Sequence, residues 1–203
     1  MYSPLRNNIE GIVKLTDLEW NLLVPHLKIR KLKKNELFVE IGKTYNEMGF
    51  VLKGVLRHYY LKEGEEKTTS FYFENNIVAA YFSCITNQPS KLAIEALSNC
   101  ELIVFPYNVL LGLYKKNKTW HEFGRLLAEY IVLSMEERMV GLLIYSPEER
   151  YQKLIEGNEE RYRKILKGNK TKIIENIPQR YIADYLGITP VSLSRIRNRV
   201  SKK

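Results

Sequence analysis

The feature that most constrains the fold is the segment 179–198, QRYIADYLGITPVSLSRIRN, near the end of the 203-residue chain. Its apolar residues recur at helical spacing on both sides of Gly187, and Ala183 is small enough for two helices to approach closely. Gly187 can adopt the positive φ that ends a helix, while Thr189 can cap the next helix and Pro190 suits its first position. The segment therefore predicts a helix-turn-helix.

The charge of the chain is concentrated around this segment. Residues 178–203 hold six basic side chains and one acidic side chain, so they carry +5 of the formal net charge of +9. An ordinary antiparallel helix pair in a small bundle would also satisfy the apolar spacing, but its solvated faces normally mix both signs. A basic cluster on and beyond the second helix is typical of phosphate contact, and we expect the target to be duplex DNA.

The helix-turn-helix hypothesis assigns separate roles to the polar side chains of the segment. If the second helix lies in the major groove, residues near its N-terminus and one turn later face base edges. These are Val191, Ser192, Ser194, Arg195 and Asn198. Arg195 is the best candidate for a bidentate contact to guanine O6 and N7. The residues expected to hold phosphates are Gln179, Arg180, Thr189, Arg197 and Arg199.

Length and composition exclude several classes of protein. A chain of 203 residues is too long for one bare three-helix unit and suits two domains. No apolar run has the length of a signal peptide or a membrane span, so we expect a cytoplasmic protein without a membrane partner. With only Cys84 and Cys100, a disulfide framework or a zinc site is not expected, and both residues are predicted to be buried thiols.

The sequence offers no constellation for catalysis. It contains no Gly-rich phosphate loop, no pair of His at metal spacing and no nucleophile elbow. We therefore expect no enzyme activity, no catalytic residues, no metal site and no cofactor.

Residues 27–105 have the pattern of a strand meander. Short apolar or β-branched runs alternate with turn residues, which favours a barrel. The runs are LKIRKL, ELFVEIG, MGFVLKGVLRHYYL, KTTSFYF, KLAIEAL and ELIVF. Before them, Thr16 and Asp17 precede apolar residues at helical spacing, which predicts a short entry helix within 16–27 that Pro25 ends or bends.

Residues 119–143 predict one long helix. One apolar row runs through Trp120, Phe123, Leu127, Ile131, Met135, Met139 and Leu142, and a second row widens the stripe. A stripe this wide implies two partners, namely the barrel on one face and the same helix of a second subunit on the other. The residues expected at the dimer contact are Phe123, Leu127, Tyr130, Ile131 and Met135. A helix buried entirely inside a monomer is the alternative.

In this order, a barrel, a long apolar helix and a C-terminal helix-turn-helix resemble the Crp/Fnr family of bacterial transcription regulators. The segments that carry the resemblance are VLKGVLRHYY, IEALSNCELIVF, SPEERYQKLI and IPQRYIADYLGITPVSLSRIR. The resemblance implies an α+β fold: a cyclic-nucleotide-binding-like β-barrel of jelly-roll or double-stranded β-helix type, a dimerisation helix and a winged-helix-like DNA-binding domain. We expect the boundaries 1–118, 119–145 and 146–203.

The resemblance also implies partners. It suggests a homodimer on a palindromic operator, contact with RNA polymerase, and a small effector in the barrel that shifts a hinge near residues 141–146. An alternative is a ligand-binding barrel whose C-terminal helices recruit a protein instead of DNA. The segment 156–176 predicts one helix and a short loop, and Lys202 and Lys203 are expected to replace part of the wing that many relatives carry.

The effector is the part of the resemblance that fits least well. Cyclic-nucleotide-binding members carry a Gly-Glu pair and an Arg followed by Ser or Thr, but the matching positions here are Ala79, Ala80, Ser90 and Lys91. The carboxylate and the guanidinium fork are both missing, so cyclic AMP is not expected and another effector, or none, is implied. An isolated Lys at a loop end is usually a solvated surface residue. The cysteine cluster of oxygen-sensing relatives is also absent, and His26, His58 and His121 are isolated and predicted to be structural.

Overall fold

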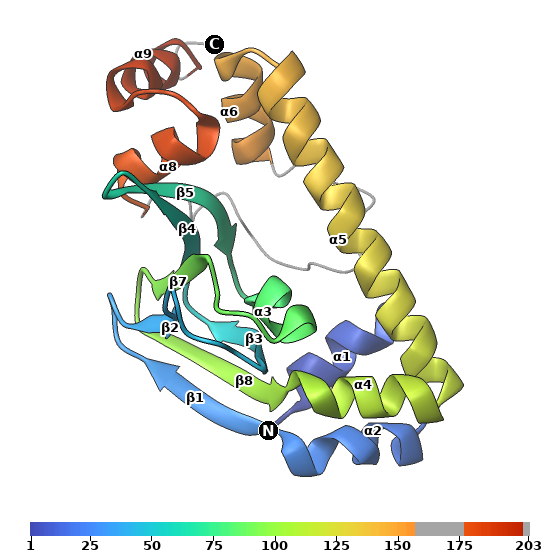
Figure 1. Cartoon of the computed structure of the whole chain (residues 1–203). Helices are drawn as coiled ribbons and strands as arrows, with labels where there is room; N and C mark the ends of the chain where they lie inside the picture. Colours follow the sequence, from blue (N-terminus) through green and yellow to red (C-terminus); the bar gives the residue numbers. More distant parts are fainter. Residues whose placement is uncertain (157–176, 201–203) are drawn as a thin grey trace.

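The computed structural model describes residues 1–156 and 177–200 (Figure 1). The chain begins with α1 (Ser3–Glu10), α2 (Asp17–Leu23) and a 3₁₀ turn, η1 (Val24–His26). Eight strands follow: β1 (Lys28–Leu32), β2 (Leu37–Val39), β3 (Glu47–Lys53), β4 (Leu56–Lys62), β5 (Glu65–Tyr72), β6 (Ile77–Ala79), β7 (Leu92–Ala96) and β8 (Cys100–Pro106). The helices after β6 are α3 (Tyr81–Thr86), α4 (Tyr107–Lys116), α5 (Lys118–Ile144), α6 (Pro147–Glu156), α8 (Gln179–Leu186) and α9 (Pro190–Val200).

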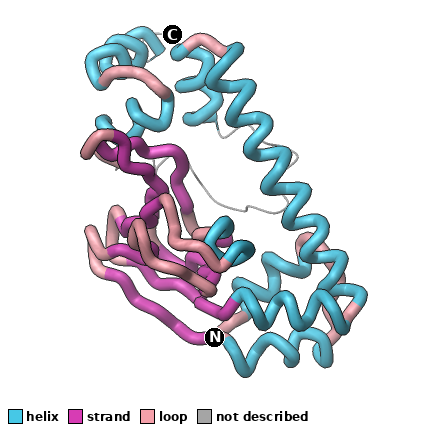
Figure 2. Tube along the Cα trace, viewed as in Figure 1, coloured by secondary structure: helices cyan, strands magenta, loops and turns pink. Residues whose placement is uncertain are grey.

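The strands form two four-stranded antiparallel sheets, ordered β1-β8-β3-β6 and β2-β7-β4-β5 (Figure 2). Their inner faces enclose an apolar core in which Phe38, Val51, Leu56, Ile94 and Leu102 are almost completely buried. The six strand-forming runs of the sequence all fall on these strands, so the predicted barrel is confirmed.

The β3–β4 turn depends on Gly54. Its φ is +98°, and a Cβ added there would lie 2.6 Å from Sγ of Cys100 and 2.7 Å from the carbonyl oxygen of Asn99. Only glycine combines this backbone conformation with so close an approach. The interruption of the run 48–61 at Gly54 therefore marks the corner of a hairpin.

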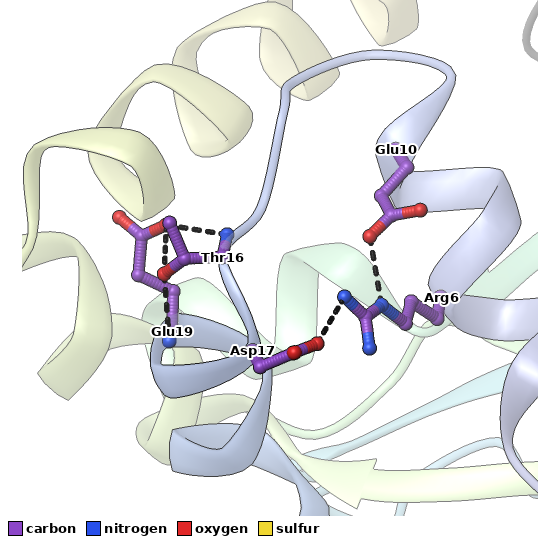
Figure 3. A network of polar contacts seen from close by, with 5 residues as sticks. All are labelled: Arg6, Glu10, Thr16, Asp17 and Glu19. Carbon is purple, nitrogen blue, oxygen red and sulfur yellow. Dashed lines mark hydrogen bonds and ion pairs between the residues drawn. The ribbon is translucent and has the colours of Figure 1, made fainter.

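Polar contacts around Thr16 and Arg6 fix the entry to the barrel (Figure 3). Thr16 and Glu19 form a capping box at the start of α2, and Arg6 pairs with Glu10 at 2.7 Å and with Asp17 at 2.7 Å. Pro25 lies in η1 directly after α2, so the predicted entry helix and its end are confirmed.

Glu19 also anchors the start of α5. Its carboxylate accepts a hydrogen bond from Asn117, and its backbone carbonyl accepts one from the indole of Trp120, each at 3.1 Å. A hydrogen bond from Thr119, followed by one from the Thr16 backbone, lowers the pKa of Glu19 to about 2. The first turn of the long helix is therefore held on the N-terminal helices.

The first half of α5 completes a second core with α1, α2 and α4. Trp120 and Phe123 are fully buried there, with ring centroids 5.7 Å apart in an edge-on arrangement. Figure 1 shows that α5 then runs past the barrel to α6, at the opposite end of the molecule. The predicted long helix is confirmed, within one residue at its start and at its end.

Helices α1, α3, α4 and α6 were not predicted from the sequence. Helix α1 contains Pro4 in its first turn and two Asn, α3 has only six residues, and α4 lies in a stretch that the strand pattern did not assign. The predictions for 156–176 and for Lys202 and Lys203 lie almost wholly outside the described residues. None of the helices in residues 1–156 and 177–200 combines the length and apolar character needed to cross a membrane.

Candidate nucleic-acid interface

Helices α8 and α9 meet at the turn that the sequence predicts. Gly187 adopts a left-handed conformation with φ of 66°, and Ile188 N–H donates to the carbonyl of Ala183 at 3.0 Å. The Thr189 hydroxyl accepts a hydrogen bond from the amide of Ser192 at 3.2 Å, which caps α9. The buried contact between the two helices includes Ile182, Ala183, Leu186, Leu193 and Ile196.

One face of α9 is open to solvent. Its exposed side chains are Val191, Ser194, Arg195, Asn198 and Arg199, while Ser192 and Arg197 are half-buried. Arg199 lies 3.6 Å from the carboxylate of Glu148 on α6, a loose and exposed ion pair. The structure thus brings the residues predicted to contact bases onto one helix, with most of them on its free surface.

The residues predicted at the start of α8 lie closer to the barrel. Gln179 and Thr189 are exposed. Arg180 is also exposed, but its guanidinium packs over the ring of Tyr181 and donates to the phenol oxygen at 2.5 Å. Its charge remains available at the edge of α8 beside strand β5.

Helix α8 packs directly against the barrel, as Figure 1 shows at strand β5. Phe71 and Phe73 of the barrel join the core of the C-terminal helices, and the rings of Phe71 and Tyr185 are 5.5 Å apart. The apolar contact is continuous from β5 through α8 to α9. The barrel and the helix pair are therefore in direct contact.

Arg57 lies at the centre of that contact and is only 1% exposed. Its guanidinium pairs at 2.5 Å with Glu66 and with Glu95 and stacks 3.9 Å from the ring centroid of Tyr181. Burial lowers the pKa of Arg57, but the bonds to the two carboxylates outweigh burial and raise it overall. The arginine stays charged and ties strands β4, β5 and β7 to α8.

A second arginine connects α5 to the same helix. Arg138 donates a hydrogen bond to the backbone carbonyl of Tyr185 and stacks 3.9 Å from the centroid of its ring. Burial, followed by the nearby positive charge of Arg150, lowers the pKa of Arg138. Helix α8 is thus held from the barrel side by Arg57 and from the α5 side by Arg138.

The predicted hinge between residues 141 and 146 coincides with the joint between α5 and α6. Only Tyr145 and Ser146 separate the two helices. The Arg150 guanidinium donates to the carbonyls of Tyr145 at 2.8 Å and Leu142 at 3.3 Å, and Ser146 and Glu149 cap the start of α6 reciprocally. The joint has a defined hydrogen-bonded geometry.

The residues at the cyclic-nucleotide positions surround α3. Ala80 is buried in the core between the sheets, and Ala79 is half-buried at the end of β6. The Ser90 hydroxyl is buried and donates to the carbonyl of Leu92 at 2.8 Å. Lys91 is exposed, with its ammonium 5.5 Å from the ring centroid of Phe82.

The residues predicted at the dimer contact divide along α5. Phe123 and Leu127 lie in the core of the protomer, and Tyr130 and Ile131 line a pocket beside it. Met135 is 68% exposed. The apolar surface that continues from Met135 also includes Val132, Met139, Leu142 and Leu143.

Sequence reasoning missed Arg57, Arg138 and Arg150. Their partners are distant in sequence or are backbone carbonyls, so no spacing pattern marks these arginines. Cys84 and Cys100 are free and buried, as predicted. His58 is isolated, and burial lowers its pKa to about 4.

Comparison with known protein families identifies a domain that the barrel resembles. Residues 29–117 match the family model of the cyclic nucleotide-binding domain. Among curated proteins, none matches the chain. The barrel and the helix α4 that follows it are therefore similar to a cyclic nucleotide-binding domain.

Solved structures extend the match over both ends of the chain. FixK2 from Bradyrhizobium japonicum is 17% identical, with a TM-score of 0.66 over 87% of this chain and 85% of that one. A putative transcriptional regulator of the Crp/Fnr family from Eubacterium rectale is 19% identical, with a TM-score of 0.66 over 92% and 84%. The Catabolite Activator Protein of Thermus thermophilus is 15% identical, with a TM-score of 0.54 over 93% and 84%. The chain has the fold of the Crp/Fnr regulators, which confirms the resemblance.

Proposed function

We propose that the protein is a cytoplasmic, sequence-specific DNA-binding transcription regulator of the Crp/Fnr type. The observation that carries the proposal is the exposed face of α9, where Arg195 stands between Val191 and Asn198 on a helix that is capped and packed as in a helix-turn-helix. Arg195 reads base edges, and the positive charge of Arg180, Arg197 and Arg199 holds phosphates. RNA polymerase is the expected partner at the promoter.

The proposal includes a homodimer formed through the second half of α5. Val132, Met135, Met139 and Leu142 follow each other at intervals of three and four residues, and all are exposed apolar side chains. Such a row is the pattern of a helix that packs along a second helix. A two-fold pair of α5 helices would present two α9 helices to a palindromic operator.

The proposal also holds that the effector is not cyclic AMP. Ala79 and Ala80 offer no carboxylate, and the Ser90 hydroxyl is occupied by the backbone of Leu92. Lys91 supplies a single charge in place of a bidentate fork. We place the domain boundaries at residues 118 and 145, where α5 begins and ends within one residue.

The main alternative is that α8 and α9 recruit a protein. It is not favoured, because two of the similar structures named above are a putative transcriptional regulator and a catabolite activator protein. No observation on α9 points to a protein groove instead of a nucleic acid. The two functions differ in how binding responds to salt.

Selection of bound sequences from random duplex DNA, followed by anisotropy titrations on the enriched site, tests the proposal. We expect affinity to fall steeply with salt, because each neutralised phosphate releases counterions. Arg195→Ala should cost about 1–3 kcal/mol on the selected site and relax the preference at one base pair. Arg125→Ala, on an exposed arginine of α5, is the control and should leave DNA binding unchanged.

Two outcomes of these experiments would contradict the proposal in whole or in part. If no sequence is enriched, or if binding does not depend on salt, the DNA-binding function is wrong and recruitment of a protein becomes the better explanation. A preference that survives Arg195→Ala would remove Arg195 from the base contacts while leaving the class of function intact.

A further inference from the structure

Val191 is the one large apolar side chain that lies exposed between residues 177 and 200, the C-terminal part of the chain that the structure describes. It is 62% exposed, whereas Leu193 and Ile196 of the same helix are buried against α8. The packing of α8 on α9 therefore does not use Val191. A single exposed apolar residue is ordinary on a protein surface, so its position on the helix has to show whether it faces a ligand.

Val191 follows Pro190 in the first turn of α9, the end of the helix whose side chains face base edges in the function proposed above. The Thr189 hydroxyl accepts a hydrogen bond from the amide of Ser192 at 3.2 Å and lies 3.0 Å from the Ser192 hydroxyl, so the geometry of this turn is well defined. A β-branched side chain in a helix has one strongly preferred rotamer. The two methyl groups of Val191 therefore point outward from α9 in one main orientation.

The base edges in the major groove offer one apolar group, which is the C5 methyl of thymine. The other groups there are hydrogen-bond donors and acceptors, and an apolar side chain would leave them without a partner. Helix α9 contains no acidic residue, so no carboxylate on it can accept a hydrogen bond from N4 of cytosine. Val191 therefore favours thymine over the other three bases at the position that it reaches.

Arg195 lies four residues beyond Val191 and is exposed on the same face of α9. Four residues of an α-helix span about 6 Å, and successive base pairs are about 3.4 Å apart along the duplex. Side chains at this spacing reach base pairs that lie within about two steps of each other. Each half-site should therefore combine a thymine with the guanine that Arg195 contacts.

We propose that Val191 is a specificity-determining residue, whose methyl groups contact the C5 methyl of a thymine close to the guanine read by Arg195. The contact selects one base in each half-site without a hydrogen bond. It rests on the DNA-binding function proposed above and adds a named base to the operator.

Deoxyuridine has the hydrogen-bonding edge of thymine but lacks its methyl group, so it tests the contact on the full chain. Each thymine within about two base pairs of the guanine at which Arg195→Ala relaxes the preference is replaced in turn, and anisotropy titrations measure the affinity. The wild-type protein should bind roughly fourfold more weakly at one of these positions, as expected for one buried methyl group. At that position, 5-methylcytosine should recover a similar factor relative to cytosine.

Val191→Ala tests whether this residue makes the contact. Because Val191 is exposed, the substitution should leave the fold intact. It should weaken binding to the thymine site by a similar factor and abolish the difference between thymine and deoxyuridine. Ser194→Ala changes an exposed neighbour on the same helix and is the matched control, which should keep the difference that the wild type shows.

The selection and the deoxyuridine titrations separate this inference from the proposed function. If a sequence is selected and bound with the expected salt dependence, but every deoxyuridine site binds like thymine, the contact alone is wrong. A selected half-site without a thymine near the guanine, or a full difference that persists in Val191→Ala, would overturn it in the same way. If no sequence is selected, the DNA-binding function fails at that step, and the contact fails with it.

Discussion

Residues 118–131 of α5 lie against the barrel and the N-terminal helices, whereas residues 132–144 extend beyond them toward α6 (Figure 1). Phe123 is 1% exposed in the first part and Met135 is 68% exposed in the second, although both belong to one apolar row. The difference teaches that helical periodicity identifies an apolar face but not what covers it. The neighbouring elements decide what covers the face, and on α5 they cover only the first part of the helix.

The largest effect is expected from truncating a side chain in the buried half. Trp120→Ala should destabilise the protein by about 3–5 kcal/mol, because it removes a fully buried ring and leaves a cavity. It also removes the indole donor to the carbonyl of Glu19. Met135→Ala is the matched change in the exposed half and should shift the stability of the protomer by less than about 0.5 kcal/mol. Urea unfolding of both variants measures the contrast, and similar losses would show that Met135 is covered in solution.

The next effect concerns association. Met135→Asp should convert the proposed dimer to monomer at micromolar concentration, because it places two carboxylates in an apolar helix contact; a loss of about 2–3 kcal/mol is expected for a desolvated charge. Met135→Leu keeps the apolar surface and serves as the control. Sedimentation equilibrium reports both, and a wild-type protein that sediments as a monomer would refute the dimer.

The smallest effects come from two glycines, one in each half of α5. A Cβ at Gly124 would lie 2.8 Å from the ring of Tyr114, whereas at Gly141 the nearest atom is Tyr145 Cδ2 at 3.9 Å. Gly141→Ala should therefore stabilise the helix by about 0.5–1 kcal/mol. Gly124→Ala should lose that gain and destabilise by about 1 kcal/mol, because the ring must move. Thermal melts of the two variants should shift in opposite directions; shifts of the same sign would mean that α4 yields without cost.

Local chemistry explains which parts of this fold the sequence predicts. The left-handed conformation of Gly187 and the cap at Thr189 depend on residues within the same turn, so the local amino-acid sequence is enough to predict them. The strands of the barrel are predicted for the same reason, because alternation and turn residues are local. The position of α9 decides which of its residues are exposed. Their role as DNA contacts stays a prediction.

What could not be predicted depends on contacts that are distant in sequence. Arg57 contacts Tyr181, which is more than half of the chain away in sequence, and no residue near either of them indicates the contact. The expectation that one face of α5 covers the barrel and another faces a second subunit stays a prediction. The structure divides a single apolar row between core and solvent, because the residues that bury Phe123 and Leu127 do not extend as far as Met135.

The joint between α5 and α6 limits the directions in which the C-terminal helices can swing. Only two residues connect the helices, and the guanidinium of Arg150 reaches back to carbonyls of the last turn of α5. These hydrogen bonds tie the first turns of α6 to the last turn of α5, so α6 cannot change direction without breaking them.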